Sequence, residues 1–134
     1  MIKVVAAYIP SGDKFLITKR AKGELKGLWE FPGGKVEKDE SNFAALEREI
    51  KEELNIEILP QKELQTFTHN YPFAEIHLNL IHCDLPDNQT ITSDGSHTKY
   101  LWVTLAETRN KKFAPLDEKI INYLKYINPL SKSV

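Results

Sequence analysis

Residues 34–56 read GKVEKDESNFAALEREIKEELNI, and this stretch decides both the local fold and the chemistry of the chain. Glu49, Glu52 and Glu53 stand three and four residues apart, so a helix places their carboxylates on one face. Neighbouring carboxylates repel each other even when they are solvated. A hard divalent cation such as Mg²⁺ offsets this repulsion, because it binds carboxylate oxygens together with water and substrate phosphates. The three glutamates therefore predict a metal site.

A solvated acidic helix face is the competing interpretation, and the surrounding sequence argues against it. Residues 31–34, Phe-Pro-Gly-Gly, predict a strand end that breaks into a loop where backbone can approach a ligand closely. Ser41 is a good N-cap for the helix that follows. An apolar stripe at helical spacing predicts that one helix face is buried while the glutamates occupy another. The stripe comprises Phe43, Leu46, Ile50 and Leu54.

The same stretch resembles the Nudix box, G-x5-E-x7-R-E-U-x-E-E-x-G-U with U an apolar residue, and the preceding LWEFPGG resembles the lead-in of its MutT-like branch. The segments VVAAYI, ITKRA and FAPLDEKII extend the resemblance over nearly the whole chain. Asn55 is the one departure within the box, where the family has glycine. Asn tolerates left-handed backbone best after Gly, so we expect a small cost in stability and none in chemistry. The resemblance implies the Nudix α/β/α sandwich, a mixed sheet between helices, as one domain over residues 1–134.

The resemblance also implies roles for the residues of the box. Glu52 and Glu53 match direct Mg²⁺ ligands, with Mn²⁺ as an alternative ion, and the Gly33 carbonyl matches a backbone ligand. Glu49 is the candidate that binds a metal and deprotonates the attacking water. Arg48 is expected to orient Glu49 rather than to touch substrate. A plain surface ion pair between Arg48 and Glu52, at i and i+4, is the alternative.

The loop before Trp102 departs from the MutT-like pattern, in which a glutamate and a histidine often precede the tryptophan. Here that place holds Ser96 and His97, and serine is neither a base at neutral pH nor a strong Mg²⁺ ligand. Asp94 or His97 replaces the missing glutamate, or Glu49 acts as the base without help. The sequence leaves these alternatives open. Glu40, the remaining acidic residue of the box, is expected further from the metal.

Substrate recognition rests first on Asp117, which lies in APLDEKII where the family reads the base with Asn or Asp. The alternative is a helix N-terminal charge that complements the dipole. Tyr71 and Phe73 are candidates for stacking on the base, or for ordinary packing. The further substrate-binding candidates are Arg20, Phe31 and Lys35, of which Arg20 and Lys35 could instead be solvated.

Composition favours a small nucleotide over a polymer. The 134 residues include 18 basic and 19 acidic ones, a formal net charge of −1, so the basic excess typical of proteins that bind DNA or RNA is missing. Cys83 is the only cysteine, which excludes an internal disulfide and suits a cytoplasmic protein; we interpret it as a core residue. The apolar runs are too short for a signal peptide or a membrane span. We expect a monomer or homodimer.

Apolar periodicity and turn residues predict the order of the elements. The two runs at residues 2–9 and 14–20, separated by PSGD, are expected to pair as antiparallel neighbours. Residues 85–97 are polar and turn-rich and are expected to form a mobile surface loop. We further predict strands at 28–31, 56–67, 74–83 and 99–103, helices at 41–54 and 116–127, frayed residues at 128–134, and core positions for Trp29 and Trp102.

These features predict a Mg²⁺-dependent nucleoside triphosphate pyrophosphohydrolase of the MutT type, which releases a nucleoside monophosphate and pyrophosphate. Cleansing the nucleotide pool of 8-oxo-dGTP is the leading hypothesis. Preference for CTP, dCTP or a modified pyrimidine nucleotide is the nearest alternative, because GLWEF and the Asp of APLD also resemble that branch. A nucleotide-binding domain with a weakened site is the alternative of another class, supported by Ser96 alone.

Overall fold

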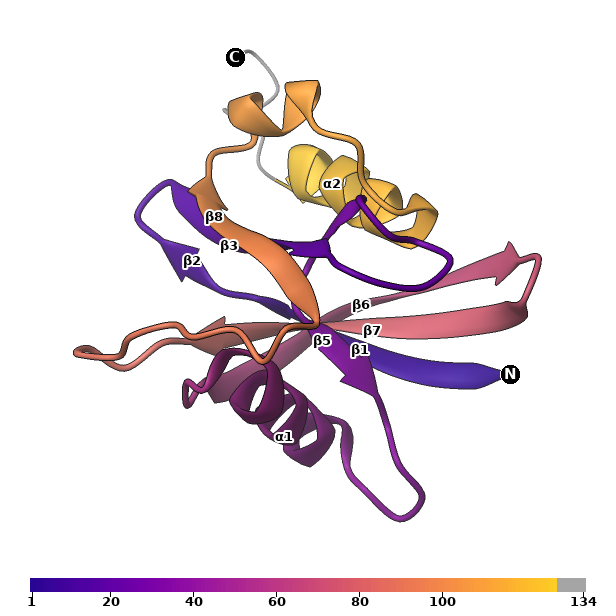
Figure 1. The fold of residues 1–134 in the computed structure, drawn as a ribbon, viewed down its shortest axis with the longest axis horizontal. Helices are drawn as coiled ribbons and strands as arrows, with labels where there is room; N and C mark the ends of the chain where they lie inside the picture. Colours follow the sequence, from indigo (N-terminus) through magenta and orange to yellow (C-terminus); the bar gives the residue numbers. More distant parts are fainter. Residues whose placement is uncertain (128–134) are drawn as a thin grey trace.

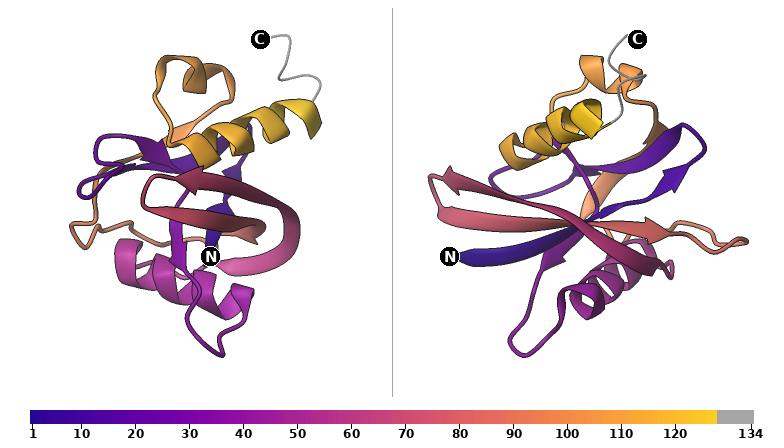
Figure 2. Two further views of the ribbon diagram at one scale, coloured as in Figure 1. Left: turned by 90° about the vertical axis from the view of Figure 1, so that its right-hand side faces the viewer. Right: turned by 180° about the vertical axis from the view of Figure 1, so that it is seen from behind.

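The structure, a computed structural model, describes residues 1–127, and within them the chain forms two four-stranded β-sheets between helices (Figure 1). The fold is mixed α/β, as predicted. The first sheet has the strand order β5-β1-β7-β6, and in the second β3 pairs with β2, β4 and β8. Helices α1 and α2 lie on opposite sides of the paired sheets (Figure 2). The elements are β1 Ile2–Tyr8, β2 Pro10–Ser11, β3 Lys14–Arg20, β4 Trp29–Glu30, β5 Gly33–Lys35, α1 Asn42–Leu54, β6 Leu59–Tyr71, β7 Ala74–Asp84, β8 His97–Val103, the 3₁₀ helix η1 Ala106–Asn110 and α2 Pro115–Ile127.

The predicted pairing of residues 2–9 with residues 14–20 is wrong. Strand β1 runs parallel to β7 and antiparallel to β5, so both of its edges are occupied. Of the chain before β3, only the short β2 pairs with β3, through Pro10 with Phe15 and Ser11 with Lys14. The consecutive run Val5, Ala6 and Ala7 is at most 2% exposed, because β1 is buried on both faces. Such an apolar run is typical of a central strand, and this signal outweighs the turn at PSGD.

Helix α1 forms as its capping residues predict. The Ala44 N–H donates to the Ser41 hydroxyl at 3.1 Å, which satisfies an amide at the helix start. At the other end Asn55 adopts the left-handed conformation, with φ 54°, and its N–H donates to the Lys51 carbonyl. The stripe residues Leu46, Ile50 and Leu54 are buried. The acidic residues are therefore left on the faces that the core does not use.

Two hydrophobic clusters hold the layers together. One lies between the first sheet and α1, and contains Cys83 as a buried thiol, as predicted. The other fills the space between the sheets and α2, and contains Trp29. Trp102, the second predicted core tryptophan, is partly buried at the edge of the first cluster. The two clusters position the ends of α1 and α2 on either side of β5.

Residues 33–35, part of which was predicted as a loop, form strand β5, because they pair with β1; the other boundaries differ from prediction by a few residues. Strand β6 begins at Leu59 and extends to Tyr71, since the buried Ile56 and Ile58 precede the sheet pairing. Residues 85–96 lack regular structure, yet two backbone hydrogen bonds tie this loop to the end of α1, from Thr92 N–H to Leu54 and from Asp94 N–H to the Glu53 carbonyl. The expected fraying at residues 128–134 lies outside the described residues. No helix of the described part is long and apolar enough to span a membrane.

Candidate active site

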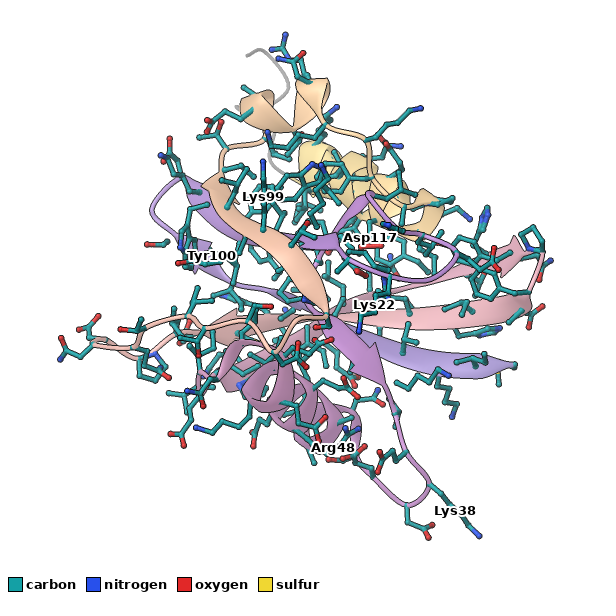
Figure 3. All side chains as sticks on the ribbon, viewed as in Figure 1. Lys22, Lys38, Arg48, Lys99, Tyr100 and Asp117 are labelled. Carbon is teal, nitrogen blue, oxygen red and sulfur yellow. The ribbon has the colours of Figure 1, made fainter. Side chains whose placement is uncertain are left out.

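A cavity of about 260 Å³ opens between the two sheets and extends from β5 to the start of α2. Its apolar wall comes mainly from β1, the β6–β7 hairpin and α2. Its polar groups come from the segments around β3, β4 and β5 and from Asp117 on α2. Figure 3 shows Asp117 at the start of α2 and Arg48 on α1. The lining residues that matter here are Arg20, Glu30, Phe31, Gly33, Gly34, Lys35, Tyr71, Phe73, Leu116 and Asp117. All six candidates for substrate binding named from the sequence therefore line this cavity.

Gly34 connects this cavity to the acidic helix. A β-carbon built on Gly34 would overlap the Glu49 carboxylate, so the glycine leaves the space that the carboxylate occupies. The Glu49 side chain is 17% exposed. Burial raises its pKa, and the adjacent Arg48 opposes that rise. Glu49 is therefore a partly desolvated carboxylate next to the loop, as a base for an attacking water requires.

Glu53 has the most unusual environment of the three glutamates. Its Oε1 atom is buried and makes no hydrogen bond with any described residue. Burial raises its pKa to about 8, and the charges of Glu49 and Glu30 add to the effect. A buried carboxylate without a partner is costly when ionised, and a bound cation removes that cost. This oxygen therefore fits a metal ligand.

Arg48 organises the acidic residues around itself. Its Nε and Nη2 atoms donate to Glu40 at 2.7 and 3.0 Å, and Nη1 donates to Glu49 Oε1 at 2.9 Å. These bonds hold the pKa of Glu40 at about 2, below its usual range. The bond to Glu52 is the longest of the set, at 3.4 Å, and Glu52 is 58% exposed. The surface ion pair with Glu52 is thus a minor part of what Arg48 does.

The oxygen donors present fit a hard divalent cation. Glu49 and Glu53 supply carboxylates, and Gly33 lies on the adjoining strand. No group of three acidic, histidine or cysteine side chains within residues 1–127 is gathered closely enough to hold a metal ion. Glu52 would have to turn from Arg48 to join the other two. The predicted ligand set is thus partly assembled.

Asp117 lies at the far end of the cavity and is 6% exposed. The Phe31 N–H donates to its Oδ2 atom at 2.9 Å. Burial raises its pKa well above the usual range, and the nearby Glu30 charge contributes in the same direction. Burial therefore favours the protonated form of Asp117, whose side chain lines the cavity. Asp117 also lies in the first turn of α2, so the alternative from sequence, a charge that complements the helix dipole, stays open.

The aromatic candidates occupy different positions in the wall. Tyr71 is 9% exposed and its ring stacks on Phe73, with centroids 5.0 Å apart. Phe73 is 48% exposed at the turn between β6 and β7. The Phe31 ring stacks on Phe15 in the core, so Phe31 reaches the site mainly through its backbone. Of these rings, Phe73 offers the most surface to a ligand.

Glu30 is a cavity residue that the sequence interpretation missed. Arg20 donates to it through Nε and Nη2 at 2.9 and 3.0 Å, so a substrate contact of Arg20 competes with this pair. Burial alone would raise the pKa of Glu30, but the nearby His97 and the hydrogen bonds from Arg20 outweigh burial and lower it. The signal was available: Glu30 is a lone charge between the apolar Trp29 and Phe31 in a short strand.

The loop that lacks the family glutamate lies beside Glu53 without supplying an obvious replacement. Asp94 accepts from the Ser96 N–H at 2.8 Å, and bonds to Ser96 lower its pKa. The His97 side chain is 3% exposed, and its Nε2 lies 3.7 Å from Glu30. His97 is therefore directed at Glu30 in the interior, and Asp94 at its own loop.

Comparison with known proteins identifies the family. The NUDIX domain pattern matches residues 4–123, and the chain therefore belongs to the Nudix hydrolases, which act on nucleotides with divalent metal ions. The CTP pyrophosphohydrolase of Escherichia coli (strain K12) is 38% identical over 118 residues, which cover 87% of this chain and 86% of that protein. The 8-oxo-dGTP diphosphatase of Buchnera aphidicola subsp. Acyrthosiphon pisum is 36% identical over 107 residues, covering 80% and 85%.

Solved structures agree with the predicted fold and family. The solution structure of the E. coli ORF135 protein matches with a TM-score of 0.80 at 36% identity, covering 95% of this chain and 90% of that one. The MutT Nudix hydrolase from Burkholderia pseudomallei matches with a TM-score of 0.81 at 21% identity, covering 90% and 95%. The second likeness concerns the fold alone. Both the Nudix sandwich and the MutT-like resemblance are thereby confirmed.

Proposed function

We propose that this protein is a MutT-type nucleoside triphosphate pyrophosphohydrolase that acts with Mg²⁺ on 8-oxo-dGTP. The observation that carries the proposal is the pairing of two features across one cavity. Glu53 supplies a buried, unpartnered carboxylate oxygen near β5. Asp117 lies at the other end of the cavity, and we propose that it is a neutral acid because burial raises its pKa. The Glu53 oxygen can bind a cation that also binds the substrate phosphates, and Asp117 can form hydrogen bonds with the nucleotide base.

The phosphate end performs the chemistry. A bound divalent ion would neutralise phosphate charge and hold the attacking water. Glu49 takes the proton from that water, and Arg48 holds the Glu49 carboxylate in place through its 2.9 Å bond. Glu52 and Glu53 would hold the ion, and Gly33 would supply a carbonyl. Hydrolysis between the α- and β-phosphorus atoms then yields the monophosphate and pyrophosphate.

The base end discriminates by hydrogen-bond pattern. Phe31 uses one lone pair of Asp117 Oδ2, which leaves the acid one O–H donor and one further acceptor. Oxidation at C8 of guanine places a proton on N7 beside the O6 acceptor, and the neutral acid pairs with both. Unmodified guanine presents two acceptors at that edge. A single acid group pairs with only one of them, so 8-oxo-dGTP is favoured over dGTP.

Hydrolysis of CTP or dCTP is the second candidate, and a specific observation favours it. The E. coli relative that is 38% identical over most of this chain is a CTP pyrophosphohydrolase. Cytosine presents the N3 acceptor beside the N4 amine, so the same neutral Asp117 can bind it through two hydrogen bonds. The hydrogen bonds of Asp117 therefore do not distinguish between an oxidised purine and a pyrimidine as the substrate base.

A panel of nucleotides tests the proposal. The catalytic efficiency, kcat/KM, is measured with Mg²⁺ and with Mn²⁺ on 8-oxo-dGTP, dGTP, dCTP and CTP. We expect 8-oxo-dGTP to exceed dGTP by at least about tenfold, the scale of a hydrogen-bond mismatch in a buried site. A higher value for dCTP or CTP would transfer the proposal to the pyrimidine branch. If the protein bound nucleotides but hydrolysed none of them, the alternative of a nucleotide-binding domain with a weakened site would replace the proposal.

A further inference from the structure

Tyr71 makes a hydrogen bond that its proposed stacking role does not require. The Leu116 N–H donates to the Tyr71 hydroxyl at 3.0 Å, in a buried position. Leu116 belongs to the first turn of α2, where backbone amides lack partners within the helix. Tyr71 is the last residue of β6. Tyr71, at the end of β6, thus accepts a hydrogen bond from a backbone amide in the first turn of α2, next to the proposed base-reading Asp117.

Asp117 is therefore held from two directions. Its own Oδ2 accepts from the Phe31 N–H at 2.9 Å, which links it to the segment between β4 and β5. The adjacent Leu116 is bonded to Tyr71, which links the same helical turn to β6. Both bonds are buried, where an unmade hydrogen bond is costly. Together they fix where the acid faces the cavity.

The ring of Tyr71 fixes a second part of the cavity. Phe73 stacks on it at 5.0 Å with an interplanar angle of 13°, and His69 meets it edge-on at 4.6 Å. Two protein side chains therefore already cover the Tyr71 ring, which is 9% exposed. Phe73 remains 48% exposed and lines the cavity with Asp117.

We propose that Tyr71 is a positioning residue for nucleotide selectivity. Its hydroxyl fixes the start of α2, and its ring fixes Phe73. Asp117 and Phe73 thereby keep a fixed separation across the cavity. Phe73 is then the ring on which the base stacks, in place of Tyr71. This inference rests on the proposed function, because it assumes that Asp117 reads the base.

The test is Tyr71→Phe, which keeps the ring and removes the hydroxyl. We expect the ratio of kcat/KM between the preferred nucleotide and dGTP to fall about tenfold, through a higher KM for the preferred nucleotide. Phe73→Ala should instead raise KM on all nucleotides alike, because stacking is tolerant of base identity. Tyr100→Phe is the matched control, since Tyr100 is an exposed tyrosine on β8 outside this cavity (Figure 3).

Amide hydrogen exchange provides a readout that does not depend on activity. Exchange at Leu116 should be protected in the wild type and faster in Tyr71→Phe, and unchanged in Tyr100→Phe. Unchanged selectivity in Tyr71→Phe, or an equal loss on every nucleotide, would overturn the positioning role. If the wild type hydrolyses no nucleotide, the proposed function is wrong, but the positioning role of Tyr71 is still to be tested. Binding of the corresponding monophosphates then decides, since Tyr71→Phe either loses binding selectivity, as we expect, or keeps it and refutes the inference.

Discussion

Gly34 and Glu49 occupy adjoining space, and a β-carbon at Gly34 would overlap the Glu49 carboxylate. Gly33, one residue earlier, would instead place its β-carbon against the backbone of Val5 and Ala6 in the neighbouring strand. Gly34 therefore leaves room for the Glu49 side chain, and Gly33 leaves room for the neighbouring strand. We therefore expect substitution of Gly34 to affect activity and substitution of Gly33 to affect folding.

The first prediction uses that contrast. Gly34→Ala should fold, because the end of a Glu side chain can move aside, but turnover should fall by at least ~10²-fold as the carboxylate is displaced. Gly33→Ala should lose thermal stability, because backbone cannot move aside in the same way. Circular dichroism melts and turnover measured on both variants check this. Near wild-type turnover in a folded Gly34→Ala would show that the position of Glu49 is not critical.

A second prediction concerns the pH dependence caused by Glu53. Its pKa of about 8 in the folded protein lies above the ordinary 4.5, so the folded state binds the proton more tightly than the unfolded state. Without metal, stability should therefore fall as pH rises from about 4.5 to about 8. Mg²⁺ should restore more stability at pH 8 than at pH 5, because it stabilises the ionised carboxylate. Urea titrations with and without Mg²⁺ measure both effects.

Glu53→Gln is the matched variant for that measurement. It should flatten the pH slope and remove most of the Mg²⁺ effect, while turnover falls at least ~10²-fold. A slope that persists in Glu53→Gln would assign the titration to another group, such as Glu49.

The third prediction asks which residue acts as the base. Glu49→Gln should lower turnover by about 10²- to 10⁴-fold, the range for loss of a general base. Asp94→Asn and His97→Gln should each change turnover only a few-fold, since Asp94 is bonded to Ser96 and His97 is directed at Glu30. If His97→Gln were as damaging as Glu49→Gln, the loop would supply an essential group.

Asp117→Ala provides the fourth prediction. Loss of the acid should lower kcat/KM on the preferred nucleotide by about ten- to a hundredfold and on poor nucleotides much less, because the metal and phosphate groups are untouched. The nucleotide panel described above measures it. A uniform loss on every nucleotide, or none, would mean that the base is read elsewhere.

The box helix could be predicted from sequence because its signals are local. Ser41, the apolar stripe and Asn55 act within a few residues of the helix they define, and each has the expected conformation. The pairing of β1 was mispredicted because sheet partners are distant in sequence: β1 pairs with β7, about seventy residues later. Turn residues such as PSGD show where the chain reverses, but not which strands become neighbours.

In the candidate site, too, local features could be predicted from the sequence, whereas contacts between distant residues could not. The box glutamates and Arg48 were predictable, since they are fixed by spacing along one helix. The contacts of Glu30 with Arg20 and His97 depend on three separate strands, so no local pattern identifies them. The bond between Leu116 and Tyr71 likewise joins residues 45 positions apart. Tertiary structure was needed to show that Tyr71 contacts α2 and that Phe73 has the exposed ring.

The most direct test of the account is the identity of the products formed from 8-oxo-dGTP with Mg²⁺, resolved by phosphorus NMR for the wild type and Glu53→Gln. We predict 8-oxo-dGMP and pyrophosphate in equal amounts from the wild type, at a rate at least ~10²-fold above that of the variant. Release of inorganic phosphate and a nucleoside diphosphate, or equal rates in the two proteins, would contradict the proposed hydrolysis at this site.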